Sequence, residues 1–243
     1  MMKRVQSFED TRKRRSRIFR LLKYVGLLFI AFEVFSVFGL KSWVVGSSSM
    51  LPTLAPKDRI IVASSAYGLN NPITGSRAAF KAPERGDVVL LRLPSSRLSP
   101  WQDRFFDSLI RFLTLQMTGS TRRGAPEGMP VVKRVVACPG DSVMLDGFVV
   151  YVKASGTSHY LTEYETSGGD YAINGGRPVD DWDASMPLSG TMAPVELGAD
   201  EFFVVGDDRF SSADSRFFGP VKGGHIIGKV ILRYWPVDRI SGL

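Results

Sequence analysis

Three consecutive serines, Ser47 to Ser49, precede the sequence Met-Leu-Pro-Thr-Leu at positions 50–54. A serine hydroxyl is a poor nucleophile and needs a nearby base to attack a carbonyl group. Histidine is the usual base, but His159 and His225 are the two histidines of the chain, and neither lies in a sequence context typical of catalysis. The chain also lacks the G-x-S-x-G motif of one large class of serine hydrolases. The sequence therefore does not indicate a histidine-dependent serine hydrolase.

Lysine can also activate a serine, provided that burial lowers its pKa from about 10.4 toward neutrality. Lys133 lies within the apolar sequence Val-Val-Lys-Arg-Val-Val at positions 131–136. On a β-strand its side chain would share one face with Val131 and Val135, opposite Arg134. Two interpretations remain open from these residues alone. Lys133 is either a buried general base or a charged residue that protects an edge strand from aggregation.

The positive charge of the chain is confined to its N-terminal segment. Residues 1–23 hold nine Lys or Arg and two acidic residues, which accounts for the whole net charge of +7. The other 220 residues are electrically balanced, which argues against a nucleic-acid-binding face and leaves only the basic tail as an alternative site. A basic tail beside an apolar segment is typical of the cytoplasmic flank of a membrane anchor, and it can bind anionic lipids.

Residues Tyr24–Leu40 form an apolar segment of 17 residues with one charge, Glu33. As a helix it would be roughly 26 Å long, at the short end of what a bilayer requires. Lys23 and Lys41 bracket it, and no convincing small-x-small cleavage site follows. We therefore expect an uncleaved transmembrane anchor at 24–40, a cytoplasmic tail at 1–23 and an extracytoplasmic domain at 41–243. The role of Glu33 in such a span stays open.

The rest of the chain is rich in short segments of Val and Ile that are separated by Gly, Pro and Asp. These segments predict a mostly β, largely antiparallel domain. The sequence Leu-Asp-Gly at 145–147 predicts a hairpin turn. A single cysteine, Cys138, excludes an intrachain disulfide. The predicted strands lie within residues 58–63, 86–93, 130–137, 141–154, 201–207 and 225–236.

Two regions depart from this pattern. Residues 94–129 form an insert, in which apolar residues at 100–117 recur with helical spacing. Such an amphipathic helix either packs on the β domain or lies on the membrane surface. The segment of roughly 146–200 becomes rich in Gly, Ser and Asp, which suggests an inserted smaller β lobe. No cluster with metal-ligand spacing and no phosphate-binding loop is present, so we expect no cofactor.

Four blocks occur in order after the apolar segment: SSSMLPTL at 47–54, RGDVVLL at 85–91, KRVVACPGD at 133–141 and GDDRFSSADSRFFGPV at 206–221. Together they closely resemble the bacterial type I signal peptidases, Ser-Lys endopeptidases that remove signal peptides from exported proteins. The resemblance implies a coiled antiparallel β catalytic domain outside the cytoplasmic membrane. It also implies cleavage after small residues of the Ala-x-Ala type. The expected partners are preprotein signal peptides, the lipid bilayer and the protein export machinery, but no nucleic acid.

The resemblance also assigns roles to individual residues. Ser49 matches the catalytic nucleophile of the family, and Lys133 matches its general base. Ser47 stands where a serine hydroxyl assists the Ser49 backbone N–H in holding the oxyanion. Ser212 matches the serine that orients the lysine.

Further residues match supporting positions. Asp214 and Arg216 correspond to a supporting charged pair, and Met50 and Leu54 are expected to line a shallow apolar substrate pocket. Asp208 departs from the family pattern, which usually has Asn there, and its effect is open.

Two alternatives to a general signal peptidase remain. One is a specialised Ser-Lys processing peptidase with a dedicated substrate. The other is a non-catalytic homologue that binds signal peptides, although the presence of Ser49, Lys133 and Ser212 argues against it.

Overall fold

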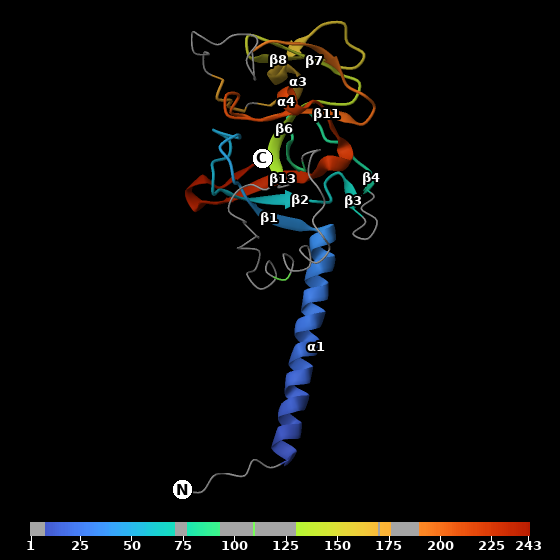
Figure 1. Cartoon of the computed structure of the whole chain (residues 1–243), viewed down its shortest axis with the longest axis vertical. Helices are drawn as coiled ribbons and strands as arrows, with labels where there is room; N and C mark the ends of the chain where they lie inside the picture. Colours follow the sequence, from blue (N-terminus) through green and yellow to red (C-terminus); the bar gives the residue numbers. More distant parts are fainter. Residues whose placement is uncertain (1–7, 71–76, 93–108, 110–129, 170, 176–189) are drawn as a thin grey trace.

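The computed structural model describes residues 8–70, 77–92, 109, 130–169, 171–175 and 190–243 (Figure 1). The predicted amphipathic helix at 100–117 and the insert at 94–129 lie outside these residues, apart from Leu109. The predicted limits of tail, anchor, insert and lobe therefore stay predictions.

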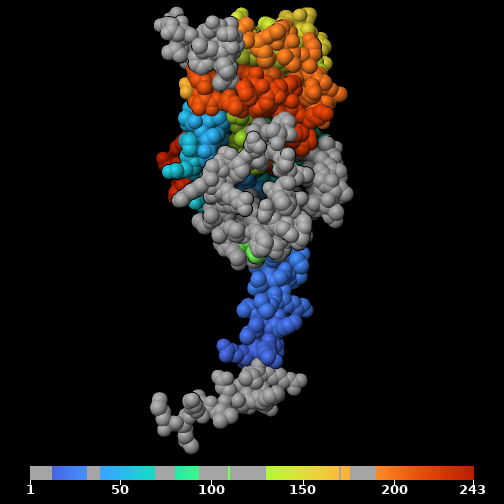
Figure 2. Space-filling model, viewed as in Figure 1, coloured from blue at the N-terminus to red at the C-terminus, as the bar shows by residue number. Residues whose placement is uncertain are grey.

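A long helix, α1 (Phe8–Phe38), projects from the β domain as a narrow stalk (Figures 1 and 2). It includes most of the basic N-terminal segment, so charged and apolar residues share one continuous helix. The predicted transmembrane span at 24–40 is not supported, because no helix in the described part of the chain combines the length and apolarity that crossing a membrane requires.

The mostly β, antiparallel prediction is confirmed. The main sheet has eight strands, ordered β1-β2-β13-β5-β6-β11-β12, with β14 paired to β13, and every pairing is antiparallel. The C-terminal strand β13 lies between two strands from the first half of the chain. The strands are β1 (Leu40–Val44), β2 (Arg59–Ala63), β5 (Val88–Leu91), β6 (Val131–Ala137), β11 (Glu201–Val205), β12 (Val221–Lys222), β13 (Ile226–Trp235) and β14 (Ser241–Gly242).

A second antiparallel sheet, ordered β10-β7-β8-β9, forms the smaller lobe at the end of the domain away from α1 (Figure 1). Gly147 and Phe148, both with positive φ, form the predicted two-residue turn between β7 and β8. The elements are β7 (Ser142–Asp146), β8 (Val149–Lys153), β9 (Leu161–Thr162), α3 (Glu163–Ser167) and β10 (Met192–Glu196).

Five short elements complete the described part of the main domain. They are the hairpin of β3 (Gly68–Asn70) and β4 (Arg77–Ala79), the helix α4 (Ser215–Phe218), and the 3-10 turns η1 (Gly223–His225) and η2 (Val237–Arg239).

Strand β6 lies where three apolar clusters meet. Val132 packs in one cluster with residues of β2 and β13, Val135 in a second with residues of β5 and β11, and Val136 in a third with residues of the smaller sheet. Burial of these side chains fixes the strand in place, since each contributes roughly 1.5–3 kcal/mol. A polar side chain on β6 is therefore held in a rigid, dry environment.

Candidate active site

Strand β6 places Lys133 between β5 and β11, with its backbone directly opposite Val89. The side chain of Lys133 is 2% exposed. Burial lowers the pKa of Lys133 from 10.5 to about 8, and the negative charge of Asp214 opposes this change only in part. A substantial fraction of this amine is therefore neutral at mildly alkaline pH.

Ser49 lies in the turn that follows β1, and the turn is anchored by the apolar residues beside it. Met50 and Leu54 are 1% and 0% exposed and pack in the core cluster with Val132. The N–H of Leu54 also donates to the carbonyl oxygen of Met50 at 2.8 Å. Both side chains fill the core beneath the serine turn, and their assignment to a shallow apolar substrate pocket stays a prediction.

The structure brings Ser49, Lys133 and Ser212 together from three distant parts of the chain. Lys133 Nζ lies 2.9 Å from Ser49 Oγ and 2.8 Å from Ser212 Oγ. Ser47 Oγ lies 3.1 Å from Ser49 Oγ, and Ser47 is exposed whereas Ser49 is buried. In the serine turn, Ser49 thus contacts the buried Lys133, whereas Ser47 is exposed to solvent.

Asp214 determines which way the Ser212 hydroxyl points. Ser212 Oγ donates to Asp214 Oδ2 at 2.6 Å, so its oxygen is free to accept from Lys133. Arg216 Nε donates to Asp214 Oδ1 at 2.8 Å. Burial alone would raise the pKa of Asp214, but the hydrogen bonds from Arg216, Gly206 and Ser212 and the charge of Arg216 together lower it. Asp214 is therefore an ionised acceptor that fixes the direction of the Ser212 O–H bond.

Gly206 follows β11 and allows the nucleophile turn to approach the Ser212 segment. A Cβ atom at this position would lie 2.2 Å from Ser212 Oγ and 2.4 Å from the carbonyl oxygen of Ser49. Both distances are too short for any side chain, so only glycine fits here.

Asp207 and Asp208 follow this glycine and have separate contacts. Asp207 forms a bidentate ion pair with Arg134, the neighbour of Lys133. Arg134 Nε donates to Asp207 Oδ1 at 2.8 Å, and Nη2 donates to Oδ2 at 2.6 Å. The Asp208 N–H donates to the carbonyl oxygen of Ser49 at 3.0 Å, and its carboxylate accepts from the N–H groups of Phe210 and Ser211. Asp208 therefore caps a local turn.

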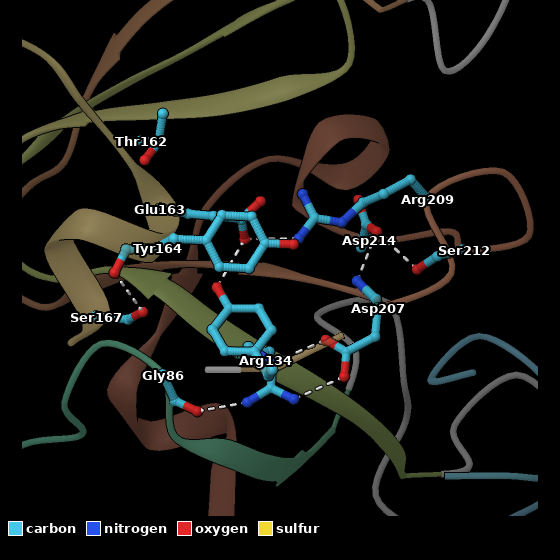
Figure 3. Close-up of polar contacts among 12 residues, drawn as sticks. Gly86, Arg134, Thr162, Glu163, Tyr164, Ser167, Asp207, Arg209, Ser212 and Asp214 are labelled. Carbon is cyan, nitrogen blue, oxygen red and sulfur yellow. Dashed lines mark hydrogen bonds and ion pairs between the residues drawn. The ribbon is translucent and has the colours of Figure 1, made fainter. Parts of the chain in front are cut away.

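Sequence reasoning missed a buried polar network around Glu163 and Arg209 (Figure 3). Glu163 and Arg209 form an ion pair of 2.6 Å, and Tyr171 donates its hydroxyl to Glu163 at 2.9 Å. The sequence held a signal for the helix alone, because Thr162 and Glu165 have the spacing of a capping box, which predicts a helix beginning at Glu163.

The described histidines lie apart from Ser49. His225 Nδ1 is 3.2 Å from the carbonyl oxygen of Arg92, and His159 is in an exposed loop. Neither has a contact with the serine turn in the described residues. The arrangement therefore offers Ser49 a lysine partner.

Comparison with known proteins adds to this geometry. A family model described as "Signal peptidase, peptidase S26" matches residues 18–235. Signal peptidase I of Leptolyngbya laminosa is 27% identical over 223 residues, which cover 90% of this chain and 82% of that protein. Signal peptidase I P of Bacillus subtilis subsp. natto is 24% identical over 235 residues, covering 96% and 97%. Signal peptidase I of Bacillus caldolyticus is 35% identical over 111 residues, covering 45% and 56%.

The family match spans most of the chain, including all four sequence blocks and the residues that meet around Lys133. The resemblance predicted from those blocks is confirmed, and the chain belongs to the signal peptidase family, peptidase S26.

Proposed function

We propose that this chain is a membrane-bound serine endopeptidase that removes signal peptides from exported preproteins with a Ser49–Lys133 dyad. The observation that carries this proposal is the position of the buried Lys133 amine, 2.9 Å from Ser49 Oγ and with its pKa lowered to about 8. Burial and a nearby hydroxyl are what a lysine needs to act as a general base.

Hydrogen bonding orients the amine for this task. The single proton of Ser212 is directed to Asp214, so Ser212 accepts one N–H of the neutral Lys133. The lone pair of the amine is then directed to the remaining polar neighbour, the hydroxyl of Ser49. Lys133 takes the Ser49 proton while Ser49 Oγ attacks the scissile carbonyl carbon.

The negative charge that develops on the carbonyl oxygen needs donors in place before the attack. The backbone N–H of Ser49 has no hydrogen-bond partner in the described part of the chain, and the exposed hydroxyl of Ser47 lies 3.1 Å from Ser49 Oγ. We assign both to the oxyanion hole, where each donor contributes roughly 3–4 kcal/mol. Protonated Lys133 then donates to the leaving amine. A water then gives one proton to Lys133 as its oxygen bonds to the acyl carbon, and Lys133 passes that proton to Ser49 Oγ as the bond between Ser49 and the acyl carbon breaks.

The substrate in this proposal is a preprotein with small residues at the first and third positions before the cut, as the family resemblance implies. Met50 and Leu54, which are expected to line the substrate pocket, are buried in the core beneath the serine turn. Their contribution is to hold the serine turn rigid.

We also place α1 at the bilayer of the bacterial cytoplasmic membrane, with the basic residues 1–23 inside and the domain of 41–243 outside. Signal peptides emerge there from the export machinery. Support comes from the exposed apolar side chains of α1 beyond residue 23, among them Val25, Leu27, Leu28 and Ile30. Exposed apolar surface on this scale is typical of a membrane or protein contact. The full chain should float with vesicles, and serine at these four positions should weaken flotation.

The proposed function is tested by cleavage of a preprotein with an Ala-x-Ala site in detergent micelles. We expect the wild type to cut after the second Ala, and Ser49→Ala and Lys133→Ala to be inactive but folded by circular dichroism. Normal cleavage by Lys133→Ala would refute the dyad. Cleavage of one dedicated preprotein alone would favour the specialised peptidase, and binding without cleavage would favour the non-catalytic homologue.

A further inference from the structure

A buried carboxylate of the smaller lobe lies next to the segment that holds the dyad. Glu163, the first residue of α3, is 1% exposed. Its Oε2 atom accepts from Arg209 Nη2 at 2.6 Å and from the hydroxyl of Tyr171 at 2.9 Å, as Figure 3 shows for its labelled residues. One carboxylate oxygen thus binds two partners from different parts of the chain.

Arg209 depends on this carboxylate. Its side chain is 1% exposed, and within the described residues its Nε and Nη1 atoms have no hydrogen-bond partner. Burial lowers the pKa of Arg209, but the charge and hydrogen bond of Glu163 raise it, and the net change is upward. Removing one partner of a buried ion pair leaves the other charge uncompensated, which is strongly destabilising. The conformation of Arg209 is therefore coupled to the charge of Glu163.

The backbone around Arg209 contacts the nucleophile. The N–H of Asp208 donates to the carbonyl oxygen of Ser49 at 3.0 Å, and the N–H of Arg209 donates to the carbonyl oxygen of Asn174 at 3.0 Å. The N–H of Asn174 in turn donates to the carbonyl oxygen of Asp207 at 2.8 Å. Residues 206–209 are thus held between the serine turn on one side and the smaller lobe on the other.

A second set of contacts connects Glu163 with Lys133. Tyr171, which donates to Glu163, has the guanidinium carbon of Arg134 3.8 Å from its ring centroid. Arg134 follows Lys133 on β6 and is bound by Asp207. Figure 3 shows the guanidinium of Arg134 pointing toward Asp207. Glu163 therefore supports both members of the dyad through their immediate neighbours.

We propose that Glu163 is a positioning residue that holds segment 206–209 through Arg209 and Tyr171, and thereby fixes Ser49 relative to Lys133. This inference rests on the proposed Ser-Lys peptidase function. It makes the smaller lobe a part of the machinery that sets dyad geometry, since Glu163 itself contacts neither Ser49 nor Lys133 in the described residues.

The test replaces Glu163 by glutamine, which keeps the shape of the side chain and removes its charge. The matched control is Asp87→Asn. Asp87 is also a buried carboxylate that accepts from one tyrosine hydroxyl, Tyr67, and one cation, Lys229, but no hydrogen bond joins it to segment 206–209. Two quantities are measured on the full chain in detergent: preprotein cleavage as kcat and KM, and hydrogen exchange of individual backbone amides.

We expect Glu163→Gln to lower kcat roughly 10- to 100-fold with little change in KM, because a small displacement of the reacting groups has an effect of this size. The amides of Asp208 and Arg209 should exchange at least tenfold faster relative to core amides such as Val204. Asp87→Asn should keep the wild-type kcat and the wild-type exchange at both positions. A merely structural role for Glu163 would give the two variants the same outcome.

Unchanged kcat and unchanged exchange at Asp208 and Arg209 in Glu163→Gln would overturn the proposal. If Glu163→Gln does not fold, Tyr171→Phe takes its place, and exchange at the same two amides must rise or the proposal fails. If the wild type cleaves no preprotein, the peptidase function fails, while hydrogen exchange still decides whether Glu163 holds this segment.

Discussion

Replacing Lys133 by methionine tests the central claim that this amine is buried at a cost in stability. Methionine is similar in length and has no charge, so it fits an apolar environment. The hydroxyl groups that contact the amine keep other partners after the change, because Ser212 is bound to Asp214 and Ser49 to Ser47. The substitution therefore removes the titrating group without leaving an orphaned hydroxyl.

The magnitude follows from the pKa of Lys133, which is about 8 in the folded protein and 10.5 as an ordinary lysine. Between these values the unfolded chain binds more protons than the folded protein, so the free energy of unfolding of the wild type rises with pH. Each pKa unit corresponds to about 1.36 kcal/mol, which gives a rise of about 3 kcal/mol in total. The variant lacks this rise. Its stability relative to the wild type should therefore fall by about 3 kcal/mol between pH 7 and pH 10.5.

The assay is urea unfolding of the full chain in mild detergent, followed by tryptophan fluorescence at several values between pH 7 and pH 10.5. Other titrating groups are common to both proteins and cancel in the difference. Lys153→Met is the control, since the Lys153 side chain is 34% exposed on β8. A difference between Lys133→Met and wild type that stays constant over this pH range would show that the pKa of Lys133 is not lowered in the folded protein. A fall of the same size in the control would show that it is not specific to the buried amine.

Three other predictions concern activity. Gly206→Ala should lower kcat at least tenfold and reduce stability by about 1–3 kcal/mol, because its Cβ would overlap Ser212 Oγ and the Ser49 carbonyl; kinetics and thermal unfolding measure both. The double variant His159→Gln, His225→Gln should cleave like the wild type, and a folded but inactive double variant would contradict the lysine mechanism. The wild-type kcat/KM should rise with pH and level off above about 8, whereas a flat profile down to pH 5 would exclude a lysine base.

The local elements of the fold could be predicted, but their order in the sheet could not. The Val- and Ile-rich segments mark β2, β5, β6 and β11, and the Asp-Gly sequence before Phe148 marks the turn of the smaller sheet. The pairing of β13 with both β2 and β5 depends on contacts between residues more than a hundred positions apart. No local pattern reports such contacts, so sequence periodicity left the strand order undetermined.

In the candidate site too, local motifs could be predicted from the sequence, but contacts between distant residues could not. The serine turn, Lys133 and Ser212 could be identified from their sequence blocks, and the structure brings them into hydrogen-bond contact. Apolar residues beside a nucleophile fit either a pocket or the core; the structure buries Met50 and Leu54 in the core, and their assignment to a pocket stays a prediction. Glu163 lies in a region with weak periodicity, where the capping box marks a helix but gives no sign of the buried Arg209 that pairs with it.

The charged residues around Lys133 explain why burial decides its pKa. An unpaired carboxylate close to a lysine would favour the charged amine and raise its pKa by several units in the extreme. Three buried carboxylates, Asp207, Asp214 and Glu163, lie in this part of the domain, and each is bound by its own arginine. Within the described residues, the Lys133 amine therefore contacts serine hydroxyls and no carboxylate. Because the neighbouring negative charges are already compensated, desolvation dominates, and the amine becomes neutral at a pH where it can accept a proton from Ser49.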